Sequence, residues 1–425
     1  MKHPPRGLAG IRLIAALLLV LVIAGALWVW QATRLIPVEP GPSVPHTAGL
    51  VERGAYLARA GNCAACHTER GGAAYAGGKG IATPFGTVYA SNLTPDAETG
   101  IGRWSADDFW RALHHGQSRD GRLLYPAFPY PDYARVTRED SDALHAFLLS
   151  LPPVREPNRT HTLRFPYDTQ AALVAWRSLF FSPEPFRPDT TQPAEWNRGA
   201  YLTLGLGHCM ACHAPRNALG ATANKPDFSG GQIPMQGWYA PSLASPKEAG
   251  VQDWPLDEVV RLLRDGHGAR GAAMGPMAEV VAGSTSHLRE ADLRSMGLYL
   301  QSLPVVEPPA PDAESAEPQV LALGQRLYAA KCALCHGENG LSTEPEFPSL
   351  DGHRTVTMAS SANLLRVIIG GGFPPTTPGN PAPYGMPPFG QELSDAEIAA
   401  LASYVRGAWS NRASRVLPLE VQRIR

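Results

Sequence analysis

The strongest constraint on how this 425-residue chain folds is a Cys-x-x-Cys-His motif that occurs three times. The chain contains six cysteines, and the three motifs account for all of them. No cysteine is therefore left for a disulfide framework or for a separate thiol nucleophile. The motif residues are Cys63, Cys66 and His67, then Cys209, Cys212 and His213, and finally Cys332, Cys335 and His336.

Two thiols and a histidine at this spacing are the attachment signature of c-type haem. The thiols add to the haem vinyl groups as thioethers, and the histidine becomes the proximal ligand of the iron. A zinc site would require the Cys-x-x-Cys pairs to combine two by two, which three motifs cannot do. A thioredoxin-type redox pair would leave the three histidines unexplained, and no βαβ pattern surrounds the motifs. We therefore predict three covalent haem c groups, with His67, His213 and His336 as iron ligands.

Each motif lies in a repeat with the same order of features, and repeats of this kind decide a fold before any single element does. A helical segment containing Gly54, Gly199 or Gly324 precedes the motif. A short Ser-Leu landmark follows it, then an amphipathic helix, a loop rich in Gly and Pro, and a closing helix. Gly116 and Gly266 suit the left-handed backbone just past a helix end. The predicted fold class is all-α, with three tandem class I cytochrome c domains behind one N-terminal transmembrane helix.

Changes in composition indicate the boundaries between these units. Residues 37–45 form a proline-rich spacer, and residues 305–318 form a Pro/Ala/Glu linker. The segment between the first two repeats contains Trp176, Phe180, Phe181 and Phe186, so we expect it to pack on its neighbours. The predicted units are a transmembrane anchor at 8–30, cytochrome c domain 1 at 49–157, a packed connector at 158–193, domain 2 at 194–304, the linker at 305–318 and domain 3 at 319–412.

The N-terminal segment predicts a membrane anchor. Basic residues precede an uncharged stretch from Leu13 to Trp30, which is long enough to cross a bilayer as a helix. Because the positive flank stays in the cytoplasm, the repeats are expected in the periplasm, attached to the bacterial inner membrane. A signal peptide cleaved after Ala24-Gly25-Ala26 is the alternative. The length of the stretch and its two terminal tryptophans favour a retained anchor.

Methionine is the usual sixth ligand of iron where electrons are transferred at raised potential. In the third repeat, Met386 lies in a stiff proline-rich loop before the closing helix and is the predicted ligand. In the second repeat, Met277 matches that position better than Met274, which we interpret as a core residue or one that packs beside the ligand.

The first repeat contains no methionine, and its loop places Phe128 where Met277 stands in the second repeat. Phenylalanine cannot bind iron, so the sixth position of the first haem is open or filled by another residue. His114 and His115 end the preceding helix and are candidate ligands. The alternative is that they are solvated histidines favoured by the helix dipole.

The charge balance excludes one class of partner. Lys and Arg total 37 and Asp and Glu total 38, whereas a nucleic-acid-binding protein needs a basic excess to neutralise phosphates. The sequence also lacks a P-loop, a dinucleotide-binding glycine motif and a metalloprotease helix, so it predicts no substrate chemistry of its own.

Four further motifs accompany the three repeats. They are Asn92-Leu93-Thr94-Pro95-Asp96, Thr99-Gly100-Ile101-Gly102, Leu124-Tyr125-Pro126-Ala127 and Gly205-Leu206-Gly207-His208-Cys209. On these motifs the chain resembles the tri-haem cytochrome c subunits of bacterial membrane-bound dehydrogenases over residues 49–409. This resemblance implies electron transfer from a dehydrogenase catalytic subunit, through three haems, to membrane quinone or a terminal oxidase.

One position departs from the alcohol and gluconate dehydrogenase members, in which the first loop reads Tyr-Pro-Ala-Met. Phe128 here resembles the branch associated with molybdenum hydroxylases. That resemblance implies a molybdopterin hydroxylase with an iron–sulfur subunit as partner, with a quinoprotein or flavoprotein as the alternative. A competing function is a peroxidase-like enzyme that uses an open site on the first haem, with Arg122 and His114 or His115 nearby.

Overall fold

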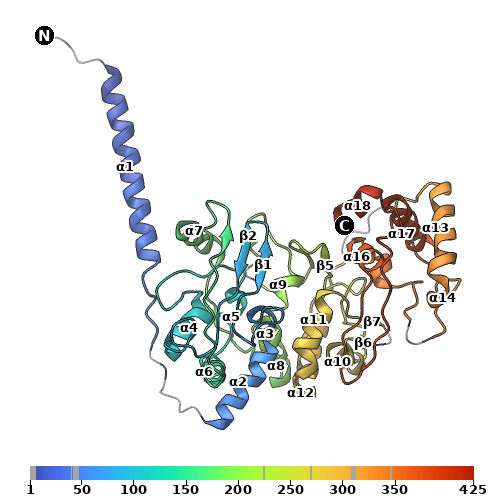
Figure 1. Cartoon of the computed structure of the whole chain (residues 1–425), viewed down its shortest axis with the longest axis horizontal. Helices are drawn as coiled ribbons and strands as arrows, with labels where there is room; N and C mark the ends of the chain where they lie inside the picture. Colours follow the sequence, from blue (N-terminus) through green and yellow to red (C-terminus); the bar gives the residue numbers. More distant parts are fainter. Residues whose placement is uncertain are drawn as a thin grey trace.

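The computed structural model describes residues 6–39, 41, 47–223, 225–268, 270–307, 313–344 and 347–425. Parts of the expected spacer and of the expected linker lie outside the described residues, at 40, 42–45 and 308–312. One long helix, α1 (Arg6–Ala32), projects from an elongated body that contains all the other elements (Figure 1). Residues Ile11–Ala32 of α1 have a mean hydropathy of 2.7 and none of the most apolar window is buried, so this helix is long and apolar enough to cross a membrane.

The body is built mostly from short helices. They are α2 (Ala48–Ala60), α3 (Cys63–His67), α4 (Ala106–His115), α5 (Tyr130–Tyr133), α6 (Arg138–Leu149), α7 (Gln170–Phe180), α8 (Ala194–Leu204), α9 (Met210–His213), α10 (Leu256–Asp265), α11 (Pro276–Gly283), the 3-10 helix η1 (Thr285–His287), α12 (Glu290–Gln301), α13 (Pro318–Lys331), α14 (Ala333–His336), α15 (Arg354–Thr357), α16 (Ala362–Gly370), α17 (Asp395–Gly407) and α18 (Pro418–Ile424).

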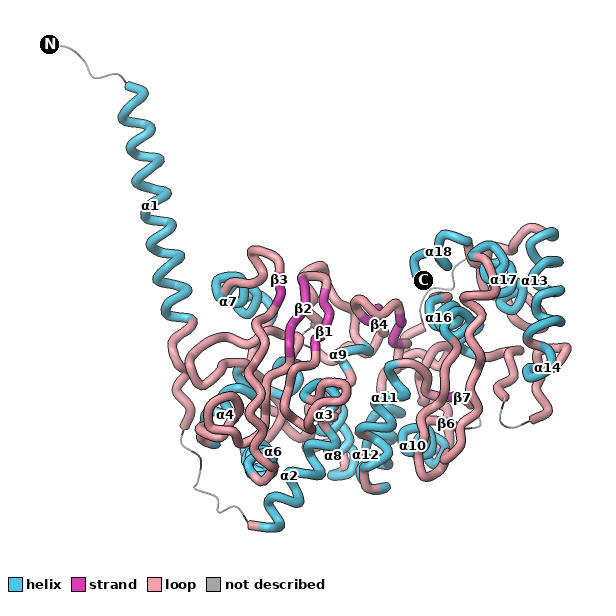
Figure 2. Tube along the Cα trace, viewed as in Figure 1, coloured by secondary structure: helices cyan, strands magenta, loops and turns pink. Residues whose placement is uncertain are grey.

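The expectation of a purely helical chain needs correction, because Figure 2 shows short strands between the helices. They form small antiparallel sheets in the glycine-rich stretches, where φ-positive residues such as Gly86 allow the chain to reverse. The strands are β1 (Gly80–Thr83), β2 (Gly86–Tyr89) and β3 (Thr162–Leu163) in one sheet, β4 (Gly231–Ile233) and β5 (Trp238–Ala240) in a second, and β6 (His267–Gly268) and β7 (Gly271–Ala272) in a third.

The same crossed pair of helices recurs three times: α2 with α6, α8 with α12, and α13 with α17. Each pair meets at the glycine of the opening helix, namely Gly54, Gly199 or Gly324. A Cβ atom at any of these positions would overlap a backbone carbonyl of the closing helix. Glycine is therefore required because it lets the two helix backbones approach directly.

The caps of these helices follow from local sequence. Ser105 and Ser394 begin α4 and α17 with reciprocal capping boxes. Gly116 and Gly266 end α4 and α10 in the left-handed conformation, with φ of 58° and 76°, which confirms that sequence prediction.

The first two repeats share one hydrophobic core, which includes Leu57 and Leu144 from the first and Leu202 and Leu293 from the second. The third repeat has a core of its own, centred on Leu365 of α16 and packed by α17 and α18. The first two repeats are thus one folded body, onto which the third is docked.

Reciprocal hydrogen bonds join the first two repeats. The Tyr201 hydroxyl of α8 donates to Asp140 of α6 over 2.6 Å, and the Tyr56 hydroxyl of α2 donates to Asp292 of α12. Each hydroxyl also accepts a backbone N–H from the start of the other repeat's closing helix, at 3.2 Å in both cases. The repeats are therefore related by approximate two-fold symmetry, as in a fused dimer.

The glycine crossing in α2 generates a prediction about stability. Gly54→Ala should destabilise the protein by about 1–3 kcal/mol, because the added methyl group forces two packed helices apart. The measurement is denaturant unfolding followed by far-ultraviolet circular dichroism.

Gly49→Ala in the same helix is the matched control, since its Cβ would meet nothing within 4 Å. It should be neutral or slightly stabilising, because alanine favours a helix more than glycine does. Equal effects of the two substitutions would contradict the close helix crossing.

Candidate haem-binding sites

All three motifs lie on short helices that directly follow the opening helices. The first motif is α3, and the second and third include α9 and α14. The residue before the first cysteine is left-handed in two of them, with φ of 48° at Asn62 and 35° at His208. This turn redirects the chain so that the motif leaves the axis of the opening helix.

The three motif histidines make the same hydrogen bond. The Nδ1 atoms of His67, His213 and His336 lie 2.7, 2.7 and 2.8 Å from backbone carbonyl oxygens. Because a carbonyl can only accept, each Nδ1 carries the proton, and each Nε2 has a free lone pair for a metal. The carbonyls belong to Ser91, Pro241 and Pro348, which open the Ser-Leu landmarks of the three repeats.

The electrostatics of the motifs keep these groups neutral. Burial lowers the pKa of all three histidines, and the carbonyl hydrogen bond opposes it only in part. Burial also raises the pKa of Cys63 and Cys209 to about 12. A neutral imidazole is the form that binds iron, and a low-dielectric site suits an apolar macrocycle.

A cavity of about 1320 Å³ extends through the second and third repeats. It exceeds the roughly 300–1,000 Å³ of a usual small-molecule site, and apolar side chains of α10, α16 and α17 line much of it. His213 and His336 both face this one cavity, together with their motif cysteines. The space therefore fits two large, mostly apolar groups held close together.

Met386 faces the cavity from a clamped loop. Its backbone exchanges two hydrogen bonds with Gly372, of 2.9 and 3.0 Å, just after α16 ends. Gly371 has φ of 62° and leaves no room for a Cβ beside the Met386 carbonyl. The thioether is thus presented from a rigid segment opposite the motif.

Met277 and Met274 both line the cavity, so the structure brings both candidates of the second repeat to it. Their surroundings differ. The Met274 methyl group lies against Gly372 of the third repeat, next to the loop that holds Met386. Met277 is in the first turn of α11, within the second repeat.

In the first repeat, Phe128 packs against the shared core together with Cys63, and its ring lies 5.3 Å from Tyr133. The His114 ring stacks on Trp110 at 4.4 Å, and the His115 ring lies edge-on to it. Phe109 and Leu113 of the same helix face the core instead. The structure therefore packs Phe128 and Cys63 against the same apolar core and stacks the His114 ring on Trp110.

Arg354 is a residue that sequence analysis missed. It extends from α15 into the second repeat, where it donates to the Gly250 carbonyl over 2.7 Å and lies 4.7 Å above the Trp254 ring. Arg270 lies over the same ring, and both arginines line the shared cavity. Two cations beside a cavity suit the propionate groups of haem.

The donor set therefore fits haem: a neutral histidine, paired thiols and an apolar cavity edged by arginine.

Comparison with known proteins agrees with this assignment. The cytochrome c family model matches residues 51–152 and 321–409, which contain the first and third motifs. The cytochrome c subunit of quinone-dependent alcohol dehydrogenase from Gluconacetobacter polyoxogenes is 38% identical over 384 residues, or 86% of this chain and 82% of that protein. The cytochrome c subunit of gluconate 2-dehydrogenase from Pantoea cypripedii is 36% identical, covering 86% of each chain.

The chain belongs to the family of dehydrogenase cytochrome c subunits. A nicotinate dehydrogenase subunit from Pseudomonas putida is 40% identical over 400 residues, which are 91% of this chain but only 33% of that longer protein. Covalent haem c and a role as the electron-transfer subunit of a dehydrogenase follow from membership of this family.

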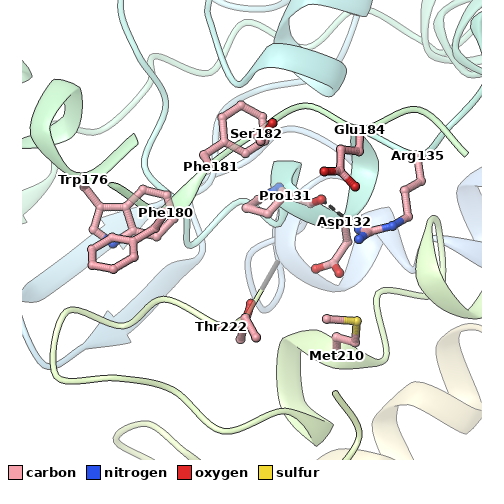
Figure 3. A pocket seen from close by; sticks show the side chains of 11 residues that line it. Pro131, Asp132, Arg135, Trp176, Phe180, Phe181, Ser182, Glu184, Met210 and Thr222 are labelled. Atoms are coloured by element: carbon pink, nitrogen blue, oxygen red, sulfur yellow. Dashed lines mark hydrogen bonds between the residues drawn. The ribbon is translucent and has the colours of Figure 1, made fainter. Parts of the chain in front are cut away.

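This cytochrome c subunit also buries a carboxyl group where its connector meets the first two repeats. Figure 3 shows Asp132 beside Arg135 and near Met210, which lies between the cysteines of the second motif. The cavity here is only about 20 Å³, enough for about one water molecule. Burial raises the pKa of Asp132 to about 7, although the charges of Arg135 and Arg216 oppose the shift.

Asp132 therefore makes the stability of the subunit depend on pH. The unfolded carboxyl has an ordinary pKa of 3.8, whereas the folded one stays protonated up to about 7. Stability should thus fall as pH rises between these values, and Asp132→Asn should remove that fall. The free energy of unfolding of the variant, relative to that of wild type, should rise by on the order of 2–4 kcal/mol between pH 4 and pH 8. The measurement is denaturant unfolding at each pH.

Glu184→Gln is the control, because Glu184 lines the same cavity but is exposed. Glu184→Gln should leave the pH dependence of the free energy of unfolding as it is in wild type. A pH dependence unchanged by Asp132→Asn would contradict the buried, protonated carboxyl.

Proposed function

We propose that the chain forms three tandem class I cytochrome c domains, at 49–157, 194–304 and 319–412, each with one covalent haem c. The observation that carries this proposal is the hydrogen bond from each motif histidine Nδ1 to a landmark carbonyl, which occurs three times at 2.7–2.8 Å. The attachment residues are Cys63 and Cys66, Cys209 and Cys212, and Cys332 and Cys335.

Haem c supplies a one-electron redox centre at each site when it is bound. His67, His213 and His336 are the proximal ligands in this proposal, and Met277 and Met386 are the sixth ligands of the second and third haems. The clamped loop at Gly372 supports Met386, and the contact of Met274 with the third repeat leaves Met277 as the ligand from within the second.

The chain holds neighbouring motifs close enough for electron transfer between them. The imidazole Nε2 of His208, next to Cys209, lies 3.3 Å from the Gly61 carbonyl, two residues before Cys63. The second and third motifs face one cavity. The second haem therefore lies between the other two along the path of the electrons.

We propose a direction for that path, which the family resemblance supports. Electrons enter from a partner dehydrogenase and leave to membrane quinone or a terminal oxidase, with the haem domains in the bacterial periplasm and α1 in the inner membrane. A molybdopterin hydroxylase with an iron–sulfur subunit is the proposed partner. Phe128 and the 40% identity to the nicotinate dehydrogenase subunit support it, although this chain spans a third of that protein.

The first test is the haem content of the purified chain. A pyridine haemochrome assay after expression in a host that matures c-type cytochromes should give three haems per chain, because all six cysteines lie in motifs. Replacing Cys209 and Cys212 by serine should reduce the content to two. A content of two or fewer in the unsubstituted chain would refute the proposal.

The methionine ligands are tested by redox titration. Met386→Leu and Met277→Leu should each lower the potential of one haem by on the order of 100 mV with attachment intact, because thioether ligation favours reduced iron. Met358→Leu is the control, since Met358 lines the same cavity but is buried beside α15 and has no proposed ligand role. If the redox titration of Met277→Leu is unchanged, Met274 is the sixth ligand of the second haem instead of Met277.

The first haem is tested with carbon monoxide. Because the His114 ring is stacked on Trp110 and the His115 ring lies edge-on to His114, we expect the reduced protein to bind carbon monoxide at one haem in three. Difference spectra of His114→Ala and His115→Ala should match wild type. Binding that appears only after one of these substitutions would identify that histidine as the ligand and contradict the expectation.

A further inference from the structure

The end of α1 is packed onto the body. Val29 and Ala32 contact a small apolar cluster that contains Leu173 and Val174 of α7, together with Leu123. Helix α7 is the helix of the connector between the first two repeats, which also contains β3. The connector is therefore held directly beside the end of the helix that is proposed to cross the membrane.

The chain that follows α1 is also fixed. The fully buried Gln117 side chain donates to the Arg34 carbonyl over 2.9 Å and accepts from the Ile36 N–H over 2.9 Å. Arg111 donates to the Ile36 carbonyl over 3.0 Å. These bonds tie residues just past the helix to the first repeat, so the body has a set orientation relative to α1.

The outer face of α7 carries no charge. Its one charged residue, Arg177, turns inward to donate to the His115 carbonyl over 2.6 Å and to lie over the Phe181 ring. Leu179 on the outer face is 69% exposed, and Phe165 in the loop before the helix is 83% exposed. The other exposed residues of α7 are Ala171 and Ser178, so the outer face is uncharged and presents Leu179 to its surroundings.

Phe165 and Leu179 belong to two consecutive segments of the connector, the β3–α7 loop and α7. Figures 1 and 2 show α7 and β3 on the side of the body from which α1 rises. Phe165 lies between these two elements in the chain. The same loop also exposes Arg164 and Asp168 beside Phe165. A surface that combines exposed apolar side chains with flanking charges, and that continues from the end of a membrane-crossing helix, suits the interfacial region of the same bilayer.

We propose that α7 and the β3–α7 loop form a membrane-contact surface, with Phe165 and Leu179 inserted among the lipids beside α1. This inference rests on the proposed anchoring by α1. It assigns the connector the task of fixing the orientation of the haem domains over the membrane, in addition to joining two of them.

The test uses the full-length, haem-loaded chain in lipid nanodiscs. The photo-crosslinking residue benzoylphenylalanine replaces Phe165 or Leu179 in separate variants, and lipid adducts are measured by mass spectrometry after illumination. Leu21 in α1 is the positive control. Leu341, which is 49% exposed after α14 in the third repeat and lies outside the attachment motif, is the negative control.

We expect lipid adducts at positions 21, 165 and 179, at levels at least about fivefold above position 341. Adducts at position 21 without adducts at 165 and 179 would overturn the contact surface and leave the anchor standing. Absence of adducts at position 21 as well would overturn both. In native membranes, adducts from 165 and 179 to a dehydrogenase subunit in place of lipid would assign this face to the partner and overturn the proposal.

Discussion

The hydrogen bond between a motif histidine and a landmark carbonyl is the interaction on which the rest of each repeat depends. It fixes the tautomer and the direction of the imidazole ring, and it requires the chain to return past the motif before the amphipathic helix begins. The glycine-mediated crossing packs the opening helix, which leads directly into the motif, against the closing helix of the repeat. A repeat that is about one hundred residues long can therefore present an apolar site with little sheet and few long helices.

Two different junctions join the three repeats. The first two share a core and exchange the Tyr56–Asp292 and Tyr201–Asp140 hydrogen bonds, so neither can rotate without breaking both. The third repeat keeps its own core and meets the second through polar contacts, such as the paired bonds between Asn363 and Tyr239, around a common cavity. The rigid junction keeps the first and second motifs close together. The shared cavity does the same for the second and third motifs.

The first repeat differs in chemistry from the other two repeats, although it has the same order of helices around its motif. Phe128 occupies the loop position from which the other repeats present methionine, and it packs on Tyr133 in the shared core. Of the two helix-end histidines that could compensate, His114 stacks on Trp110 and His115 lies edge-on to His114. The same repeat makes the contacts with the end of α1, so the domain with the unusual site is also the one nearest the proposed membrane.

The sequence by itself determined the features that depend on neighbours in the chain. Haem attachment needs two thiols and a histidine at fixed spacing, helix ends need Ser105 or Gly116, and an apolar stretch of sufficient length predicts α1. Only the tertiary structure decided which carbonyl orients each histidine, that Tyr56 reaches Asp292, and that Met274 turns toward the third repeat. It also decided that Arg354 enters the second repeat's side of the cavity and that Asp132 is buried. These contacts join residues that are far apart in the chain. The burial and the orientation of a side chain are set only when the elements pack together, so no local sequence pattern encodes them.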